Sequence, residues 1–402
     1  MAIDNKDKKI LNVPPLRFPE FSGEWEMVSL QDIATINPKS DPLQNTFIYI
    51  DLEAVEKGEL RKIQEIMREE APSRAQRVID NNDILFQCVR PYQKNNYIHR
   101  ILNTSNQQWV ASTGYAQIRT TELPNYIYHL LNTDEFNRKV MVRCTGSSYP
   151  AINSEDLATI HLYYTPDKKE QLKISRLLDL LDKRIATQNK IIDKLKSLIK
   201  GLPHKMAEIG LQKGCWEKVL LSTVLVERKE LNSELYTVHS VSVSEGVINQ
   251  IEYLGRSFAA KDTSNYHVAR YGDIIYTKSP TGDFPYGIVK QSYIEQPVAI
   301  SPLYGVYSPT SFETGVYLHY YFMSSVLAKN YLYPLIQKGA KNTINISNQR
   351  FLENRIALPL KQTDRHNIAR ALITIQKKLD IEKCAMDSLT KQRSYLLQQL
   401  FI

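Results

Sequence analysis

The sequence has few cysteines and no long apolar run. The first argues against a disulfide-stabilised or zinc-binding protein, and the second argues against a membrane-spanning one. The 402 residues include only 4 cysteines, which lie far apart and form no Cys-x-x-Cys pair. We therefore expect buried thiols and neither a disulfide framework nor a zinc site. No apolar run approaches the roughly 18 residues of a membrane span. The charged N-terminus lacks the apolar core of a signal peptide, so we expect a cytoplasmic protein without membrane contact.

Motifs of catalysis are also missing. There is no Asn/Asp-Pro-Pro-Phe/Tyr string for amino-methyl transfer, and the nearest string, at 12–15, lacks the spacing. No glycine-rich cofactor loop follows a strand, no P-loop appears, and the Glu-x-Lys of a nuclease site does not follow Pro166-Asp167. The 8 histidines are scattered singly. We predict that the chain has no catalytic or metal site and binds no cofactor.

The charge is strongly basic. The formal net charge is +8 and the isoelectric point is about 9.0. A basic surface favours a polyanionic partner, and nucleic acid is the first candidate.

The most informative feature is an apolar seam at heptad spacing, which occurs twice. From 174 to 206, apolar residues recur at alternating steps of four and three, the period of a coiled coil. The pattern returns 194 residues later, from 368 to 400. Gln188 and Glu382 occupy corresponding polar positions, where they either fix the register or are satisfied locally. The predicted seam consists of Leu178, Leu181, Ile185, Gln188, Ile192, Leu195, Leu372, Ile375, Leu379, Glu382, Met386 and Leu389.

The globular parts repeat as well. Trp25 corresponds to Trp216, and residues 83–86 (Asp-Ile-Leu-Phe) correspond to 273–276 (Asp-Ile-Ile-Tyr). Two copies with a period near 190 predict a duplicated domain. The fold class is α+β, with the two long helices paired as an intramolecular antiparallel coiled coil in a pseudo-twofold arrangement. The expected layout is an N-terminal arm (1–24), head 1 (25–166), a long helix (167–210), head 2 (211–361) and a second long helix (362–402).

Several local elements can be predicted. Residues 47–50 (Phe-Ile-Tyr-Ile) read as a strand, and apolar spacing predicts one helix over 125–142 and one over 316–336. Gly201 and Pro203 predict a kink or break near the end of the first long helix. The proline-rich opening, 14–25, is expected to pack as an arm on head 1.

Three segments resemble the specificity (S) subunits of type I restriction-modification systems. They are residues 15–25 (Pro-Leu-Arg-Phe-Pro-Glu-Phe-Ser-Gly-Glu-Trp), residues 146–148 (Gly-Ser-Ser) followed by Ile152 and Leu157, and the ending 396–401. The resemblance covers essentially the whole chain, since two variable domains alternating with two long helices is also that family's layout. Residues 339–343 (Gly-Ala-Lys-Asn-Thr) depart from the Gly-Ser-Ser of the first copy.

The resemblance implies a non-catalytic DNA-specificity subunit. Its two heads would be target recognition domains that read an asymmetric bipartite site on double-stranded DNA. Its coiled coil would dock two methyltransferase (M) subunits, and restriction (R) subunits would join to make the nuclease. S-adenosylmethionine, ATP and Mg²⁺ would then be bound by those partners.

Loops that combine basic, amide, hydroxyl and aromatic residues near glycines are the candidate DNA contacts. In head 1 they are Lys39, Arg90, Tyr92, Gln93, Lys94, Asn95, Asn96, Arg143, Thr145, Gly146, Ser147, Ser148 and Tyr149. In head 2 they are Lys278, Ser279, Thr281, Lys338, Gly339, Lys341, Asn342 and Thr343.

Two alternatives stay open at this point. One is a coiled-coil adaptor whose heads bind proteins; it predicts no sequence-dependent DNA binding, whereas a DNA reader loses affinity steeply as salt rises. The other is a self-contained enzyme, which the missing catalytic motifs make the weakest reading.

Overall fold

The computed structural model describes residues 12–100, 107–256, 259–338 and 344–402. The chain divides into two compact units, a first unit of Met1–Thr187 with Met386–Ile402 and a second unit of Gln188–Ala385. Within the described ranges, no helix is long and apolar enough to cross a membrane.

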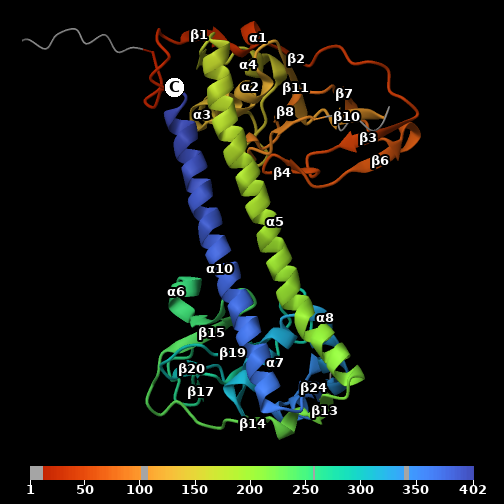
Figure 1. The fold of residues 1–402 in the computed structure, drawn as a ribbon, viewed down its shortest axis with the longest axis vertical. Helices are drawn as coiled ribbons and strands as arrows, with labels where there is room; N and C mark the ends of the chain where they lie inside the picture. The colour runs from red at the N-terminus through yellow and green to blue at the C-terminus, as the bar shows by residue number, and fades with distance from the viewer. Residues whose placement is uncertain (1–11, 101–106, 257–258, 339–343) are drawn as a thin grey trace, which may run out of the picture. The chain divides into compact units, whose positions relative to one another are not determined.

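The first unit is built from one mixed sheet, one antiparallel sheet and a short antiparallel ribbon, and Figure 1 labels most of their strands. One sheet has the order β6 (Gln64–Met67), β3 (Thr46–Ile50), β10 (Gln108–Ser112), β7 (Ala75–Val78). The other has the order β2 (Ala34–Ile36), β11 (Tyr115–Thr120), β8 (Ile84–Gln87), β9 (Tyr97–Ile98). The ribbon pairs β1 (Glu26–Ser29) with β12 (His161–Tyr164). Smaller elements are α1 (Leu30–Ile33), β4 (Val55–Glu56), β5 (Glu59–Leu60), η1 (Arg68–Glu70), η2 (Pro91–Gln93) and α4 (Ser154–Ala158).

The second unit repeats this topology. Its sheets have the orders β16 (Gly246–Asn249), β15 (Val238–Ser242), β20 (Val298–Ile300), β17 (His267–Ala269) and β14 (Leu225–Glu227), β21 (Gly305–Pro309), β18 (Ile274–Tyr276), β19 (Val289–Gln291). Its ribbon pairs β13 (Trp216–Leu220) with β24 (Arg355–Pro359). The remaining elements are η3 (Leu221–Thr223), α6 (Gln250–Leu254), η4 (Tyr333–Leu335), β22 (Gln337–Lys338), β23 (Ile344–Asn345) and α9 (Asn348–Phe351). In each unit one central pair, β3 with β10 and β15 with β20, is parallel. The predicted duplication and α+β class are therefore confirmed.

Each copy also buries one aspartate at the start of a central strand. Asp83 accepts two hydrogen bonds from the Arg119 guanidinium, at 2.8 and 2.7 Å. Asp273 accepts two from Arg228, at 2.6 and 3.0 Å. Arg119 lies in β11, whereas Arg228 directly follows β14, which is not the equivalent strand. The buried aspartate with an arginine partner is therefore common to both copies, although the position of the arginine is not.

The two helices predicted inside the heads are each divided in two. Residues 125–142 contain the end of one helix and the start of another, α2 (Pro124–Leu131) and α3 (Asp134–Arg143). Residues 316–336 contain the end of α7 (Phe312–Phe322) and the whole of α8 (Ser325–Leu332). The reason is helix capping, because the hydroxyls of Thr133 and Ser324 accept from backbone N–H groups three residues on and start a new helix.

The long helices are α5 (Lys168–Gln212) and α10 (Gln362–Gln399). All the predicted seam residues are buried or half-buried. The predicted break does not occur, because α5 continues through Pro203 to Gln212. The buried neighbours Ile199 and Ala207 hold this stretch of the helix in the second unit, which offsets the hydrogen bond that proline cannot make.

Polar contacts join the two helices within each unit. In the first unit Arg393 Nη2 donates to Asp182 Oδ2 at 3.1 Å, and Leu178 packs in one core with Leu397 and Leu400. Positions rise along α10 as they fall along α5, so the pairing there is antiparallel. In the second unit Gln188 Nε2 donates to the backbone oxygen of Glu382 at 3.0 Å. These two polar seam residues thus pair with each other, as expected for a register-fixing contact.

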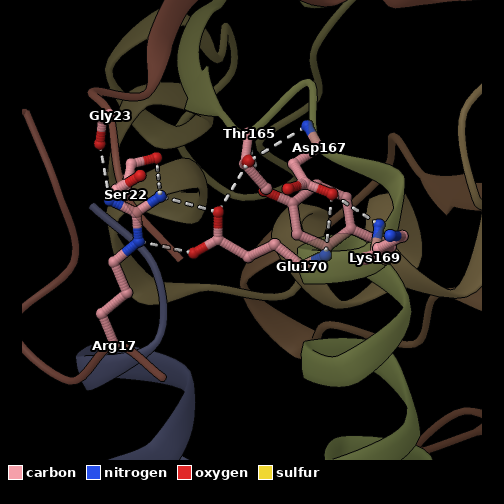
Figure 2. A network of polar contacts seen from close by, with 8 residues as sticks. Arg17, Ser22, Gly23, Thr165, Asp167, Lys169 and Glu170 are labelled. Carbon is pink, nitrogen blue, oxygen red and sulfur yellow. Dashed lines mark hydrogen bonds and ion pairs between the residues drawn. The ribbon is translucent and has the colours of Figure 1, made fainter. Parts of the chain in front are cut away.

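The N-terminal arm is held by an arginine network (Figure 2). Arg17 Nε and Nη2 donate to the buried Glu170 carboxylate at 2.7 and 2.9 Å, while Arg17 also donates to the backbone oxygens of Ser22 and Gly23. The Thr165 hydroxyl donates to the same carboxylate at 2.8 Å. The arm is therefore fixed to the first turn of α5, directly after the strand that ends head 1.

The largest core of the first unit includes the end of the chain. Phe401 packs edge-on against Trp25, with ring centroids 6.1 Å apart, and lies 5.4 Å from Tyr126. Leu397 and Leu400 belong to the same buried cluster. The fold of head 1 is thus completed by the last residues of α10 and those that follow it.

Candidate nucleic-acid interface

Head 1 contains an open cleft with a volume of about 750 Å³. It is lined by Arg90, Gln93, Asn95 and Tyr149, which belong to two loops more than fifty residues apart in sequence. The structure therefore brings four of the predicted contact residues into one site. The rest of the lining is Leu52, Glu53, Val55, Glu56, Arg61, Arg74, Gln87 and Val89.

Backbone hydrogen bonds hold the two loops together. The Arg90 N–H donates to the Pro150 oxygen at 2.7 Å, and the Ile152 N–H donates to the Cys88 oxygen at 3.1 Å. The backbone of Val89 also bridges to Ala151. Because these contacts begin directly at the end of β8, the loops extend the sheet and form a firm edge of the cleft.

The side of the cleft near β8 is lined by side-chain amides that are hydrogen-bonded in series. Gln87 is buried, its Nε2 donates to Gln93 Oε1 at 3.0 Å, and its Oε1 accepts from the Asn95 N–H at 3.1 Å. The Asn95 oxygen in turn accepts from the Lys57 N–H at 3.0 Å. Since the oxygens of Gln93 and Asn95 are occupied, these side chains present their amino groups as donors.

Charges of both signs line the cleft. Arg61 is paired with Glu59 at 2.7 Å and with Glu56 at 3.5 Å. In the part of the chain that the structure describes, no carboxylate lies within ion-pairing distance of Arg74 or Arg90. The cleft therefore offers two uncompensated cations in a site that also holds glutamates.

Two predicted contacts point away from the cleft. Lys94 Nζ pairs with Asp134 at 2.5 Å. Asn96 is buried, where its oxygen accepts from the Gln87 N–H at 2.8 Å and its amide donates to Asn132 at 3.1 Å. Both side chains tie the loop to α2 and α3.

Other head 1 candidates lie outside the lining. Arg143 donates to the Asp156 oxygen and to Thr159, at 2.7 and 2.8 Å, beside a smaller depression of about 270 Å³. Lys39 is exposed in the loop after β2, and Tyr92 is exposed on η2. Exposed residues of the turn before Tyr149 are Thr145, Gly146, Ser147 and Ser148.

In head 2 the predicted loop follows β18. Lys278 is half-buried, and burial lowers its pKa below the ordinary lysine value. Ser279 and Thr281 are exposed, and Thr281 pairs with Phe284 in a tight turn. Gly339, Lys341, Asn342 and Thr343 lie outside the described residues, as does the side chain of Lys338.

The prediction missed part of the lining. Arg61 and Arg74 come from loops around β5 and β7, and Gln87 is the last residue of β8. A glutamine ending a buried strand just before a predicted contact loop was the available signal for Gln87. Nothing local indicates Arg61 or Arg74, because the sheet topology brings them to the cleft.

Comparison with known proteins gives one family match. Residues 22–197 match the family described as type I restriction modification DNA specificity domain. Comparison with the curated proteins finds no match.

Two solved structures have a similar fold. One comes from work on the structural basis underlying complex assembly and conformational transition of the type I R-M system, with 19% identity, a TM-score of 0.56, and coverage of 94% of this chain and 97% of that chain. The other is the type I restriction-modification system S subunit from M. genitalium, with 14% identity, a TM-score of 0.58, and coverage of 97% and 99%. The TM-scores, over nearly the whole length of each chain, show a shared fold.

Over residues 22–197 the chain is thus similar to the type I restriction modification DNA specificity domain. The chain as a whole has the fold of the S subunits, and its resemblance to that family is confirmed.

Proposed function

We propose that the chain is the DNA sequence-specificity subunit of a type I restriction-modification complex and is itself non-catalytic. In this proposal each head reads one part of an asymmetric bipartite site. The observation that carries the proposal is the head 1 cleft, where donors from two loops converge beside uncompensated arginines. Double-stranded DNA presents phosphates and base-edge acceptors that such donors recognise.

The asymmetry of the site follows from the difference between the heads. The ladders Phe86–Ala116 and Tyr276–Gly305 align the two copies, and four residues further on Arg90 corresponds to Pro280. Proline has no side-chain donor, so at this position the two heads do not present the same group to a base. The two halves of the target should therefore differ.

We further propose that outward faces of the helices recruit two methyltransferase subunits, which restriction subunits then join. In the second unit Ile191, Leu198 and Ile209 of α5 are each more than a third exposed. Their spacings of seven and eleven residues place them on one face of the helix. An exposed apolar stripe of this kind is typical of a protein interface. S-adenosylmethionine, ATP and Mg²⁺ are assigned to those partners.

The test of function is adenine methylation across the host genome, with and without this gene, in the presence of its methyltransferase. We expect a split, asymmetric motif that disappears on deletion, and exchange of residues 25–166 for another head should change only one half. An unchanged methylome with an active methyltransferase would contradict the proposal. A protein adaptor would also show no sequence-dependent DNA binding and little effect of salt.

Recruitment is tested separately by a charge placed on the stripe. Ile191→Asp with Leu198→Asp should weaken methyltransferase binding by at least about 100-fold, since each buried apolar side chain contributes about 1.5–3 kcal/mol. Ser197→Asp is the matched control, because Ser197 is exposed on the same turn but faces away from the stripe. Titration of labelled methyltransferase measures both. Equal affinities for the double variant and the control would exclude this face.

A further inference from the structure

We infer that Arg90 is the residue of head 1 that reads a guanine and that Tyr149 is the residue that positions it. The inference rests on the proposed function and adds to it a particular base and the side chain that recognises it.

The first argument is the state of the Arg90 guanidinium. Its central carbon lies 4.3 Å from the centroid of the Tyr149 ring, a cation–π contact that fixes the plane of the group. Among the described residues, no acceptor or carboxylate engages the guanidinium. Its N–H donors are therefore oriented and unused at the wall of the cleft.

The second argument is the backbone. Arg90 adopts the left-handed conformation, with φ 55° and ψ 53°, and it precedes Pro91. Left-handed backbone is unfavourable for a residue other than glycine, asparagine or aspartate. The bond from its N–H to Pro150 and the η2 turn hold it there. Glycine would fit this backbone better, so the fold itself supplies no reason for arginine.

The third argument concerns the choice between a base and a phosphate. Glu53 and Glu56 line the same cleft and offset two of its three arginine charges, so the cleft attracts a phosphate less than a wholly basic site would, whereas a neutral base edge is unaffected. A planar guanidinium donates in parallel to two acceptors, and O6 and N7 of guanine present such a pair in the major groove. Adenine and cytosine place a donor amino group there, and thymine offers a single acceptor. The amino groups of Gln93 and Asn95 add further donors beside it.

The test uses the full chain in complex with its methyltransferase and a set of duplexes that carry every single base-pair change in the wild-type motif. The variant is Arg90→Gly, which removes the side chain at a backbone position that favours glycine. We expect discrimination to fall on the order of 10- to 100-fold at one G·C position of the half-site read by head 1. The other positions and the half-site of head 2 should be unchanged.

Three further variants assign the role of the ring and provide a control. Tyr149→Phe keeps the ring and should keep full discrimination, whereas Tyr149→Ala should relax the same G·C position and no other. Arg138→Gln removes an exposed basic side chain that is paired with Glu135 outside the cleft, and it should leave the motif intact. A merely structural role of Tyr149 would weaken all sequences alike.

The outcomes separate this inference from the proposed function. If the wild-type complex shows no motif, the proposed function fails. If it shows a motif that Arg90→Gly leaves unchanged, only the present inference fails. If Arg90→Gly weakens every duplex equally and lowers the salt slope by about one, Arg90 contacts a phosphate and the inference is overturned.

Discussion

Replacing Asp83 by alanine is expected to lower the free energy of unfolding of the first unit by about 3–5 kcal/mol. The carboxylate is 1% exposed and accepts from Arg119, from Gln117 Nε2 at 2.7 Å and from the Asp80 N–H at 2.7 Å. Its removal leaves the Asp80 N–H without this acceptor and takes from Gln117 Nε2 one of its two acceptors. It also leaves Arg119 with only the exposed Asp80 carboxylate, so the loss exceeds what the ion pair itself contributes. Urea denaturation followed by tryptophan fluorescence measures the loss, since Trp25 and Trp109 belong to this unit.

Asp80 provides the matched control. It also pairs with Arg119, at 2.5 Å, but its side chain is 66% exposed. Asp80→Ala should therefore cost no more than about 1 kcal/mol. Similar losses for the two variants would show that burial of Asp83 does not set its contribution.

The second large effect is expected at the end of the chain. Phe401→Ala should destabilise the first unit by about 3–5 kcal/mol, because removal of the ring leaves a cavity beside Trp25 and Tyr126 in the main core. The measurement is the denaturation midpoint of the Trp25 signal, compared with that of Trp216 in the second unit. The Trp216 transition should stay where it is.

Tyr395→Ala tests whether any aromatic residue near the end of α10 has this effect. Tyr395 is 58% exposed, so its loss should change stability by no more than about 0.5 kcal/mol. If Phe401→Ala proved equally mild, the packing of the chain end into head 1 would not be a source of stability.

The sequence predicted those features that depend on periodicity. Heptad spacing located the seam, and the repeat offset matched 83–86 with 273–276, which begin one residue before the equivalent strands β8 and β18 and continue into them. The ends of the helices inside the heads were harder to predict from the sequence. Thr133 and Ser324 cap new helices, but a hydroxyl within an apolar pattern is also compatible with a continuous helix.

The site was only partly predictable, because composition does not say where a side chain points. Arg90 and Asn96 lie in one candidate loop. Arg90 lines the cleft, whereas the buried side chain of Asn96 forms hydrogen bonds to Gln87 and Asn132 inside the head. The difference arises from the left-handed turns at Arg90 and Lys94, which reverse the chain around η2. Arg61 and Arg74 reach the same cleft through sheet pairing that no local pattern reveals.

The segments of the chain that make up each unit also determine the order in which the two units fold during synthesis. The second unit is one uninterrupted stretch, Gln188–Ala385, whereas the first needs Met386–Ile402 as well as Met1–Thr187. On the ribosome, the half of the protein that is made first must therefore wait for the last residues made. Until then Ile174, Leu178 and Trp25 lack the partners Leu397, Leu400 and Phe401. We expect the second unit to become protease-resistant first in arrested chains, and release of the finished chain to complete the first.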